Sequence, residues 1–428
     1  MINDLLPRIA VVSDYPLDGL GGAETACCEQ IRILACAGVA VTVITPAGAA
    51  AARLAVEPRV TVMGVPWRRR LPGLAVPVIR NDEPLRRRLR ARLCRDDVAA
   101  VHVHSELGLA AATLDVARDL GIPSACTVHT FFWQATGVLG TSLAQALLGL
   151  AVPRWHHWVS AHAPTHAPLV ASPGDAALRN MTLGMARRCD VVISPSEHQA
   201  HRLRAAGAGR VVTVPNGWSG TATPTPLPST ADEPLRVTWL GRCSAEKRVV
   251  PFVVAAARAV RQVGPARLRV RVVGDGPELA AARRAAGPYA GGAIEFAGRV
   301  PHDQVPTEVA RADVIALTSY GWDNQPMTVV EAVTAGRPVL YCDPALTEGL
   351  VGLDGRPGPG LLNRPDPEAL GDRLAALALD RAPVSVAARA TARAAAVFSP
   401  EAFCGGLAGA FARITDAGPV TDAGRVAA

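Results

Sequence analysis

The feature that most constrains this chain is an alternation of short, β-branched apolar runs with helical runs, which occurs twice along the sequence. Residues 8–13 are the first apolar run, a glycine-rich turn follows at 19–24, and a helical run at 25–37 leads to a strand at 39–45. This order of strand, turn, helix and strand is how parallel α/β units open. Further strands are predicted at residues 60–65, 98–104, 124–129, 191–194 and 211–214.

The alternation stops at residues 217–234, whose Thr, Pro and Ser predict a linker rather than a core element. It then restarts, with strands predicted at 236–240, 268–273, 294–297, 314–317 and 338–342 and helices at 249–263 and 327–335. Two such series predict two doubly wound domains that bind ligands at the carboxyl ends of their strands. The predicted division is a first domain at 1–216, the linker at 217–234, a second domain at 235–398, a terminal helix at 399–416 that packs back on the first domain, and a flexible tail at 417–428.

Composition narrows the class of protein. A chain of 428 residues exceeds what one hydrophobic core usually supports, and 49% hydrophobic with 19% charged residues argues against disorder. The sequence shows neither a signal-peptide pattern nor a run of ~20 apolar residues, which favours a cytoplasmic location. The nine cysteines form no CxxC or CxxH pair, so we expect neither disulfides nor a zinc site.

A net charge of +7 favours partners that carry phosphate. Much of this charge lies in residues 68–95, where a predicted helix has only a narrow apolar stripe of Leu85, Leu89 and either Leu93 or Cys94. A solvated basic helix and a patch for an anionic membrane or acceptor both fit, whereas no motif supports nucleic acid as a partner. The apolar residues 135–152 contain Thr141, Ser142 and Gln145 and predict a buried or interfacial helix.

Two cations follow the first strand of the second series. The segment Gly241-Arg-Cys-Ser-Ala-Glu-Lys247 contains Lys247, the only lysine among 44 basic residues. Arg242 is suited to binding phosphate oxygens bidentately, and Lys247 adds a compact point charge. We therefore expect both to stabilise a leaving diphosphate, whereas the alternative is an exposed turn with ordinary surface cations.

Two carboxylates, Asp323 and Glu331, lie eight positions apart around a predicted helix start at Pro326 to Met327. Backbone N–H groups at a helix N-terminus make an anion site, here suited to a diphosphate. Glu331, one turn into the helix, would accept hydrogen bonds from ribose hydroxyls, and Asp323 on the preceding loop would reach a sugar.

Five motifs in this order resemble the retaining glycosyltransferases of family 4, which have the GT-B fold. They are Gly21-Gly22-Ala-Glu24, Val214-Pro-Asn-Gly217, Gly241-Arg242 with Lys247, Val273-Gly-Asp-Gly-Pro277, and the carboxylate pair that ends in Glu331-Ala. The resemblance covers nearly the whole chain and implies two Rossmann-like domains that face each other across a cleft. It also implies a nucleotide diphosphate sugar as donor, either GDP-mannose or a UDP-sugar, and a saccharide, lipid or small-molecule acceptor.

The resemblance assigns roles to individual residues. Arg242 and Lys247 would hold the diphosphate, Glu331 the ribose, and Gly22 would allow close approach to the phosphate or acceptor. His129 would project into the cleft near the sugar's primary hydroxyl or the acceptor. The remaining donor-site residues are Arg299 and Val300 beside the base, Asn324, Gln325, Pro326 and Met327 at the sugar and β-phosphate, and Gly21, Gly241 and Gly274 in the glycine turns.

The implied reaction is a front-face, metal-independent transfer of a hexose that needs no cofactor. Arg242, Lys247 and the helix N-terminus would stabilise charge, and the β-phosphate would take the acceptor's proton. Asp323 would orient the sugar, and His129 as general base is the alternative. This chain departs from the family at Asp323, where Glu is usual, and at Asn324-Gln-Pro, where Gly-Phe-Gly is usual, so the donor sugar is the least determined feature.

Other classes of function remain open at this point. A nucleotide-sugar epimerase can share this architecture, and a decayed site would leave a non-catalytic nucleotide-sugar-binding protein. Four histidines lie between His156 and His166. We do not expect a metal there, because Pro164 interrupts helical spacing and no carboxylate lies nearby in sequence. Apolar and basic segments in the first domain favour a glycolipid acceptor at the inner membrane face, with soluble acceptors as the alternative.

Overall fold

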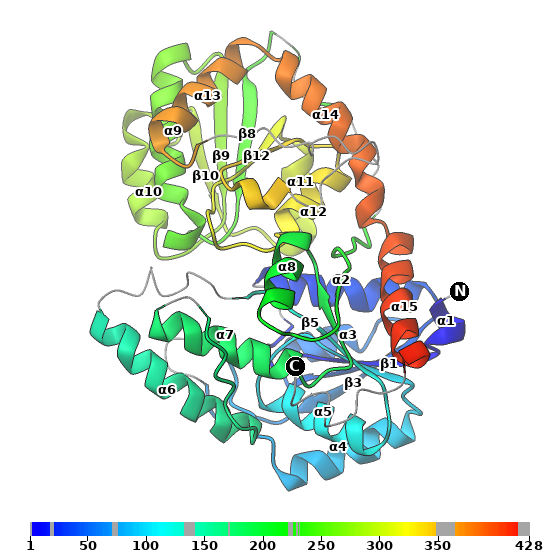
Figure 1. Cartoon of the computed structure of the whole chain (residues 1–428). Helices are drawn as coiled ribbons and strands as arrows, with labels where there is room; N and C mark the ends of the chain where they lie inside the picture. The colour runs from blue at the N-terminus through cyan, green and yellow to red at the C-terminus, as the bar shows by residue number, and fades with distance from the viewer. Residues whose placement is uncertain are drawn as a thin grey trace. The chain divides into compact units, whose positions relative to one another are not determined.

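The computed structural model describes residues 2–17, 21–70, 76–131, 142–169, 172–220, 226–227, 230, 232–347 and 364–417. The chain divides into two compact units (Figure 1). Unit 1 comprises Met1–Ser219 and Ser399–Ala428, and unit 2 comprises Gly220–Phe398. Residues 221–225, 228, 229 and 231 of the predicted linker and the tail after Ala417 lie outside the described residues.

Unit 1 is built on a seven-stranded, fully parallel sheet in the order β3-β2-β1-β4-β5-β6-β7. Its strands are β1 Arg8–Val12, β2 Ala40–Pro46, β3 Val60–Val65, β4 Ala100–Val103, β5 Ser124–Thr127, β6 Val191–Ser194 and β7 Val211–Thr213. The chain runs outward from β1 to β3 and then returns to β4. The strand order therefore reverses between β1 and β4, which is where doubly wound sheets bind ligands.

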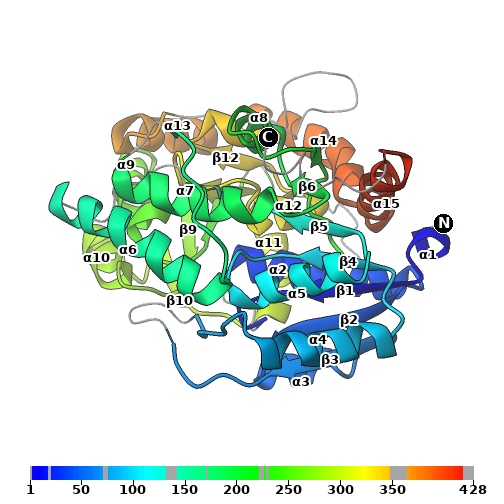
Figure 2. The same ribbon diagram turned by 60° about the horizontal axis from the view of Figure 1, so that its bottom comes forward.

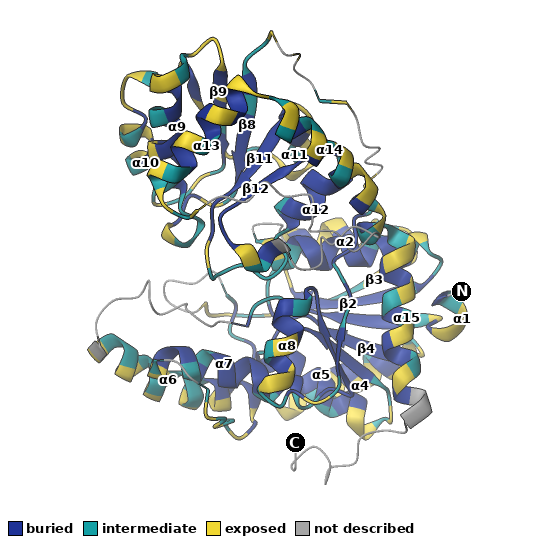
Figure 3. Ribbon diagram, turned by 45° about the horizontal axis from the view of Figure 1, so that its top comes forward, coloured by how far each residue is buried: buried dark blue, intermediate teal, exposed yellow. Residues whose placement is uncertain are grey.

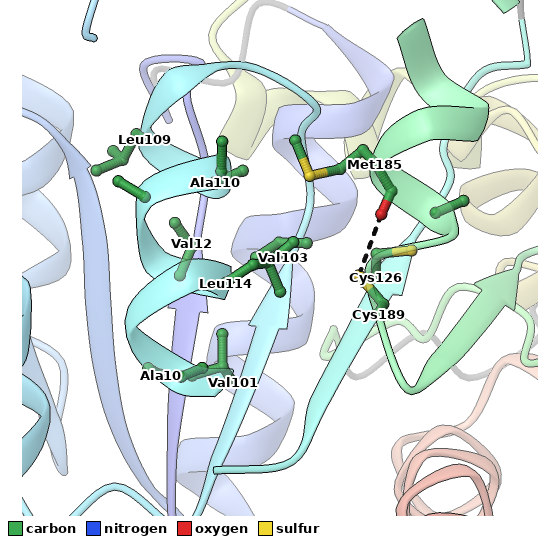
Figure 4. Packing of buried hydrophobic residues seen from close by; sticks show 14 of the residues in the cluster. Ala10, Val12, Val101, Val103, Leu109, Ala110, Leu114, Cys126, Met185 and Cys189 are labelled. Atoms are coloured by element: carbon green, nitrogen blue, oxygen red, sulfur yellow. Dashed lines mark hydrogen bonds between the residues drawn. The ribbon is translucent and has the colours of Figure 1, made fainter. Parts of the chain in front are cut away.

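Helices cover both faces of this sheet because its strands are apolar on both faces. On β1, Ala10 and Val12 face one core, which Figure 4 shows packed against α5, and Ile9 and Val11 face the other. The helices are α1 Ile2–Leu5, α2 Gly22–Cys36, α3 Ala49–Leu54, α4 Glu83–Arg95, α5 Gly108–Asp119, α6 Ser142–Ser160, α7 Pro173–Ala186, α8 Glu197–Ala205 and α15 Pro400–Ala417.

The terminal helix α15 belongs to unit 1. Phe403, Leu407 and Phe411 are buried in the same core as Ile9 and Ile31. This packing explains why the residues after Phe398 belong to unit 1, although the 179 residues of unit 2, Gly220–Phe398, precede them in the sequence.

Unit 2 holds a five-stranded parallel sheet in the order β10-β9-β8-β11-β12. Its strands are β8 Leu235–Leu240, β9 Leu268–Val273, β10 Ile294–Gly298, β11 Val314–Leu317 and β12 Val339–Tyr341. The order reverses between β8 and β11. Its helices are α9 Val249–Val263, α10 Leu279–Ala285, α11 Val305–Ala310, α12 Met327–Thr334, α13 Pro367–Leu379 and α14 Ala382–Ala394, and short 3-10 turns include η2 Ala245–Lys247.

Burial follows this arrangement. The inner strands of both sheets are buried, the edge strands β3 and β10 are only partly buried, and the outer faces of the helices are exposed (Figure 3). The two series of predicted α/β elements are thus confirmed as two doubly wound sheets. Among the described residues no single helix has the length and apolar composition of a membrane span, and one bent pair, residues 382–398 with 400–414, has both in combination.

One predicted helix had two alternatives, buried or interfacial. The described part of residues 135–152 lies in α6, which runs alongside α7 (Figure 2). Leu143, Leu147 and Leu150 are 69%, 58% and 58% exposed. These leucines at i, i+4 and i+7 share one exposed face, which excludes the buried alternative for this part and leaves the interfacial one. Residues 135–141 lie outside the described part of the chain.

Candidate functional site

The reversal between β8 and β11 brings two predicted site residues together in unit 2. Lys247 follows β8, and Asp323 follows β11, so both lie at the carboxyl edge of the sheet. Lys247 Nζ donates a hydrogen bond to Asp323 Oδ1 at 2.5 Å, and the two side chains are 23% and 10% exposed. Ser319 Oγ donates to the other carboxylate oxygen, also at 2.5 Å. The ammonium and the carboxylate therefore form one hydrogen-bonded group.

The backbone of Lys247 is fixed from the sheet below it. Trp239, in β8, is buried at 2% exposure and donates its indole N–H to Thr318 Oγ1 at 2.9 Å. The Thr318 hydroxyl in turn donates to the carbonyl of Lys247 at 2.8 Å. Trp239 lies on β8 and Thr318 directly follows β11, so the two residues tie the lysine turn to both strands that flank the reversal. Sequence reasoning did not single out either residue.

Arg242 is held separately from this pair. Its guanidinium forms an ion pair with Glu246 at 3.1 Å, and its side chain is 63% exposed. Ser244 Oγ donates to the same Glu246 oxygen at 2.5 Å. The described contacts thus hold Arg242 at the exposed surface of the turn.

Gly274 is required by a close approach of two loops. Its φ is +140°, and a Cβ added there would lie 1.8 Å from the carbonyl oxygen of Gly241. Backbone hydrogen bonds from Gly241 to Val273 and from Gly274 to Gly298 join the ends of β8, β9 and β10. The role that the structure gives Gly274 is therefore to let the loops at this edge pack together.

The remaining predicted donor residues lie on segments at the same edge. Helix α12 begins at Met327 with Pro326 as its N-cap, as predicted, and Glu331 is 7% exposed on its second turn. Asn324, Gln325 and Pro326 are half-buried on the loop before it. Directly after β10, Arg299 is exposed and Val300 is half-buried. These residues all follow strands of unit 2 at the carboxyl edge of its sheet.

In unit 1 the corresponding edge, at β1 and β4, is organised by a buried carboxylate that sequence reasoning missed. Asp14 follows β1 and is 1% exposed. Its Oδ2 accepts hydrogen bonds from Ser105 Oγ at 2.7 Å, Leu107 N at 3.1 Å and Ala110 N at 3.2 Å, and its Oδ1 accepts one from Leu109 N at 2.6 Å. Asp14 thereby satisfies the N–H groups at the start of α5.

A second carboxyl lies beside it. Tyr15 Oη donates to Glu106 Oε1 at 3.2 Å. Burial, followed by the nearby charge of Asp14, raises the pKa of Glu106 to about 7. Glu106 thus changes its charge near neutral pH at the carboxyl end of β4. The sequence signal that could have identified Asp14 and Glu106 is their position shortly after β1 and β4, the two strands at the reversal.

Three imidazoles continue this edge toward β5. His102 Nε2 lies 2.7 Å from Thr127 Oγ1, and His104 Nδ1 lies 2.8 Å from His129 Nε2. Burial lowers the pKa of His102 to about 3 and that of His129 to about 4, and with the two neighbouring imidazoles it holds the pKa of His104 well below its usual range. All three rings are therefore neutral at pH 7.

Gly21 and Gly22 stand at the start of α2, which begins at Gly22. A Cβ on Gly21 would lie 2.2 Å from Glu24 Oε2, whereas a Cβ on Gly22 would meet nothing within 4 Å. Gly22 is exposed. No described residue of this chain therefore makes the close approach that was predicted at Gly22.

The histidines between His156 and His166 serve structural contacts in the described residues. His162 Nε2 lies 3.0 Å from Asp115 Oδ1, and His157 Nδ1 lies 2.8 Å from the carbonyl of His162. His156 Nε2 lies 2.8 Å from the carbonyl of Glu106. The described part of the chain contains no group of three or more His, Cys, Asp or Glu side chains arranged to hold a metal ion.

Comparison with known proteins identifies the chain. Residues 20–218 match the family model for Glycosyltransferase Family 4, and residues 234–380 match that for Glycosyl transferases group 1. The two matches cover most of both units, in the order that the resemblance predicted. The chain belongs to the family 4 glycosyltransferases. Its two doubly wound sheets are those of the GT-B fold.

Relatives of this glycosyltransferase with known function are distant. The 2-deoxystreptamine N-acetyl-D-glucosaminyltransferase of Streptomyces fradiae is 28% identical over 261 residues, which are 58% of this chain. The match spans 55% of the length of that enzyme.

Solved structures share its fold. Anabaena HepE in complex with UDP-glucose has a TM-score of 0.65 at 16% identity, over 95% of this chain and 99% of its own. Sucrose-phosphate synthase from Thermosynechococcus elongatus has 0.64 at 18%, over 96% and 100%. The pneumococcal O-GlcNAc transferase GtfA, in complex with UDP and GlcNAc, has 0.65 at 12%, over 96% and 99%.

Proposed function

We propose that this glycosyltransferase moves a hexose from a UDP-sugar to an acceptor hydroxyl, with retention of the anomeric configuration and without a metal ion. The observation that carries the proposal is the Lys247–Asp323 pair at 2.5 Å, at the strand reversal of unit 2. An ammonium has three N–H donors, so Lys247 can keep its bond to Asp323 and still bind phosphate oxygens. The only lysine of the chain would thus join a diphosphate to a carboxylate that orients the sugar.

In the proposed reaction the bond between the sugar's anomeric carbon and the β-phosphate oxygen breaks. The acceptor oxygen bonds to that carbon on the same face, and the acceptor's proton passes to the departing phosphate. Lys247, Arg242 and the N-terminus of α12 would stabilise the charge that develops on the diphosphate. The side chain of Asp323 would accept hydrogen bonds from sugar hydroxyls rather than attack the anomeric carbon.

Two lines of support favour UDP over GDP-mannose as the donor class. HepE is described in complex with UDP-glucose, and GtfA with UDP and GlcNAc. The relative from Streptomyces fradiae is described as an N-acetyl-D-glucosaminyltransferase. We extend these donors to this chain as a proposal, together with a hydroxyl of a saccharide or small polyhydroxylated molecule as acceptor.

The test is a thermal-shift panel of the full chain against UDP-, GDP-, ADP- and dTDP-sugars, with and without EDTA. A donor at ~100 times its Kd should stabilise by about 2.7 kcal/mol. We expect the UDP-sugars to raise the Tm, and Lys247→Ala to lose most of this response. Arg242→Ala is measured in the same panel, beside Arg311→Ala as its matched control. Both arginines are 63% exposed and paired with a glutamate.

Other outcomes distinguish the alternatives. A response to GDP-mannose alone would overturn the donor class, and loss of the response in EDTA would overturn metal independence. An isomerised nucleotide sugar formed without acceptor would identify an epimerase. Binding of donor with no product from any hydroxyl acceptor would favour a non-catalytic binding protein. The anomeric proton coupling in the product reports retention or inversion.

A membrane location is a second proposal, and it depends on α6. Its exposed leucines 143, 147 and 150 share one face, and Trp158, 47% exposed, has the Arg80 guanidinium 4.8 Å from its ring centre. Apolar side chains beside cations favour binding at an anionic membrane surface. We expect co-sedimentation with vesicles containing phosphatidylglycerol, weakened by Leu147→Glu. Val386→Glu, at an equally exposed valine of unit 2, should leave it unchanged, and absence of binding by the unaltered chain contradicts the proposal.

A further inference from the structure

The residue that follows Lys247 has an unfavourable backbone conformation. Arg248 has φ 58° and ψ 40°, in the left-handed region. Residues with a side chain are disfavoured there, because the β-carbon lies too close to the following carbonyl oxygen. Four non-glycine residues in the described part of the chain have a positive φ, and of these Arg248 is the one that adjoins a predicted donor-site residue. Such conformations persist where surrounding contacts hold them, and they cluster at functional sites.

The left-handed residue sets the course of the chain around the lysine. Arg248 alone separates Lys247, the last residue of η2, from Val249, the first residue of α9. The Arg248 N–H donates to the carbonyl of Ala245 at 3.1 Å, which closes the turn η2. The Arg248 carbonyl accepts from the Phe252 N–H at 3.1 Å, in the first turn of α9. The direction of the Lys247 side chain relative to α9 therefore depends on the torsion angles of Arg248.

The guanidinium of Arg248 is anchored outside this turn. Its Nη2 donates a hydrogen bond to the carbonyl of Pro365, 117 positions further along the chain. Pro365 precedes Asp366, the N-cap of α13. The helices α9 and α13 are also joined further along, where Arg258 Nε donates to Asp372 Oδ1 at 3.1 Å. The Arg248 bond therefore connects the start of α9 to the start of a helix that is held against α9 at a second point.

We propose that Arg248 is a positioning residue, whose bond to Pro365 keeps the backbone at position 248 left-handed and the Lys247 ammonium on Asp323. The bond favours the conformation that the β-carbon disfavours, since a hydrogen bond from a charged donor is stronger than one between neutral groups. Without it the turn relaxes, and Lys247 Nζ leaves its position 2.5 Å from Asp323 Oδ1. The inference rests on the proposed function, in which this pair binds the diphosphate and orients the sugar.

Substitutions at position 248 separate the side-chain bond from the backbone conformation. Arg248→Ala keeps a β-carbon and removes the bond, so it should lose the left-handed conformation. Arg248→Gly also removes the bond, but glycine adopts a positive φ readily and should keep the turn. Arg248→Asn should resemble Arg248→Gly, because asparagine also tolerates this region. The preference against the left-handed conformation corresponds to about 5- to 30-fold in an equilibrium. We expect the Kd of the donor to rise by about that factor in Arg248→Ala and to recover in Arg248→Gly.

The decisive measurement follows Lys247 itself in the full chain. It is the only lysine of the sequence, so protein labelled with ¹³Cε-lysine gives one NMR signal, whose chemical shift reports the surroundings of the ammonium. Asp323→Ala gives the position of this signal for a lysine without its partner. We expect the signal to move most of the way to that position in Arg248→Ala and to stay in place in Arg248→Gly and Arg248→Asn. This readout needs neither donor nor acceptor, so it remains decisive if the chain proves not to bind a UDP-sugar.

Two results would overturn the proposal. An unchanged signal in Arg248→Ala would show that Lys247 keeps its partner without the Pro365 bond. A moved signal in Arg248→Gly and Arg248→Asn would show that the side chain acts other than through the left-handed backbone, and this result stands even if Arg248→Ala does not fold.

The matched control is Arg59, an arginine of unit 1 with φ 61°. Arg59→Gly should have a higher Tm than Arg59→Ala, in the same sense as at position 248, because glycine relieves the same backbone preference. Neither substitution should move the Lys247 signal. A movement there would show that loss of stability alone displaces the lysine, and would refute a specific role for Arg248.

Discussion

The buried carboxylate of Asp14 gives the sharpest prediction on stability. Four donors converge on it, three of them backbone N–H groups at the start of α5. Burial raises the pKa of Asp14 while these hydrogen bonds lower it, so the two effects oppose each other. Asp14→Asn removes the charge and keeps the shape of the side chain. Its effect on stability therefore compares the desolvation cost of the charge with the strength of its hydrogen bonds.

The magnitude follows from the individual contacts. An amide that keeps its oxygen at Oδ2 retains the bonds from Ser105, Leu107 and Ala110, but it turns an NH₂ toward Leu109 N, 2.6 Å from the present Oδ1. Hydrogen bonds to charged groups contribute about 1.5–3 kcal/mol each. Burial raises the pKa of Asp14 on balance, so the neutral amide also removes part of a desolvation cost. The lost bond and the three weakened ones, offset in part by this relief, leave a destabilisation of about 2–4 kcal/mol, and Asp14→Ala, which strands all four donors, should cost more.

The assay is urea unfolding of the full chain. Amide hydrogen exchange at Leu109 and Ala110 reports on unit 1. Exchange is measured alongside because a chain of two units need not unfold in one step. The control is Asp119→Asn on the same helix, whose carboxylate is 55% exposed and paired with Arg90, and which should change stability by at most about 1 kcal/mol. If Asp14→Asn were neutral or stabilising at pH 7, desolvation would outweigh the four donors and the reasoning would fail.

Three further outcomes follow. Gly274→Ala should lower the Tm by many degrees or prevent folding of unit 2, because its Cβ would lie 1.8 Å from a carbonyl oxygen, whereas Gly292→Ala, with 3.7 Å to its nearest neighbour, should be tolerated. The raised pKa of Glu106 means that the unfolded state releases its proton first, so the contribution of Glu106 to stability falls as pH rises from about 4.5 to about 7. That shift corresponds to about 3 kcal/mol. The buried histidines, whose pKa values are lowered, change stability in the opposite sense over this range, so urea titrations compare the unaltered chain with Glu106→Gln. The difference in unfolding free energy between the two should shift by about 3 kcal/mol against the unaltered chain, and a difference that does not change with pH would contradict the assignment. Asp323→Asn should reduce kcat far more than it weakens UDP binding; a matching loss of UDP affinity would show that Asp323 acts through Lys247 on the diphosphate.

The strands were predictable almost to the residue because both sheets are parallel and buried on both faces. Such strands are continuous apolar runs bounded by glycine or polar turns, and a pattern of that kind is distinct in sequence. Two α/β series also predict that each sheet contains a reversal, but not the strands between which it lies. What the sequence could not show was which strand-end residues touch: Lys247 and Asp323 are 76 positions apart, and their bond depends on β8 lying beside β11.

The parts that were missed share a physical cause. Asp14 and Glu106 are isolated acidic residues in short loops, and only their place after β1 and β4 distinguishes them from surface carboxylates. For α6 the sequence left a buried and an interfacial helix open, because composition reports how apolar a segment is and not whether another element covers it. Its leucines resemble core residues in sequence, yet Leu147 is 58% exposed.

The two strand reversals share a topology but carry opposite chemistry, and this difference argues for which unit holds the phosphates. At β1 and β4 the groups are the carboxyls of Asp14 and Glu106 and three neutral imidazoles, which would repel a diphosphate or leave it uncompensated. At β8 and β11 an ammonium, an exposed guanidinium and a helix N-terminus gather instead. Like charges disfavour binding by several kcal/mol when juxtaposed. We therefore propose that the diphosphate binds in unit 2 and that unit 1 binds hydroxyl groups, for which its neutral imidazoles and carboxyls offer donors and acceptors.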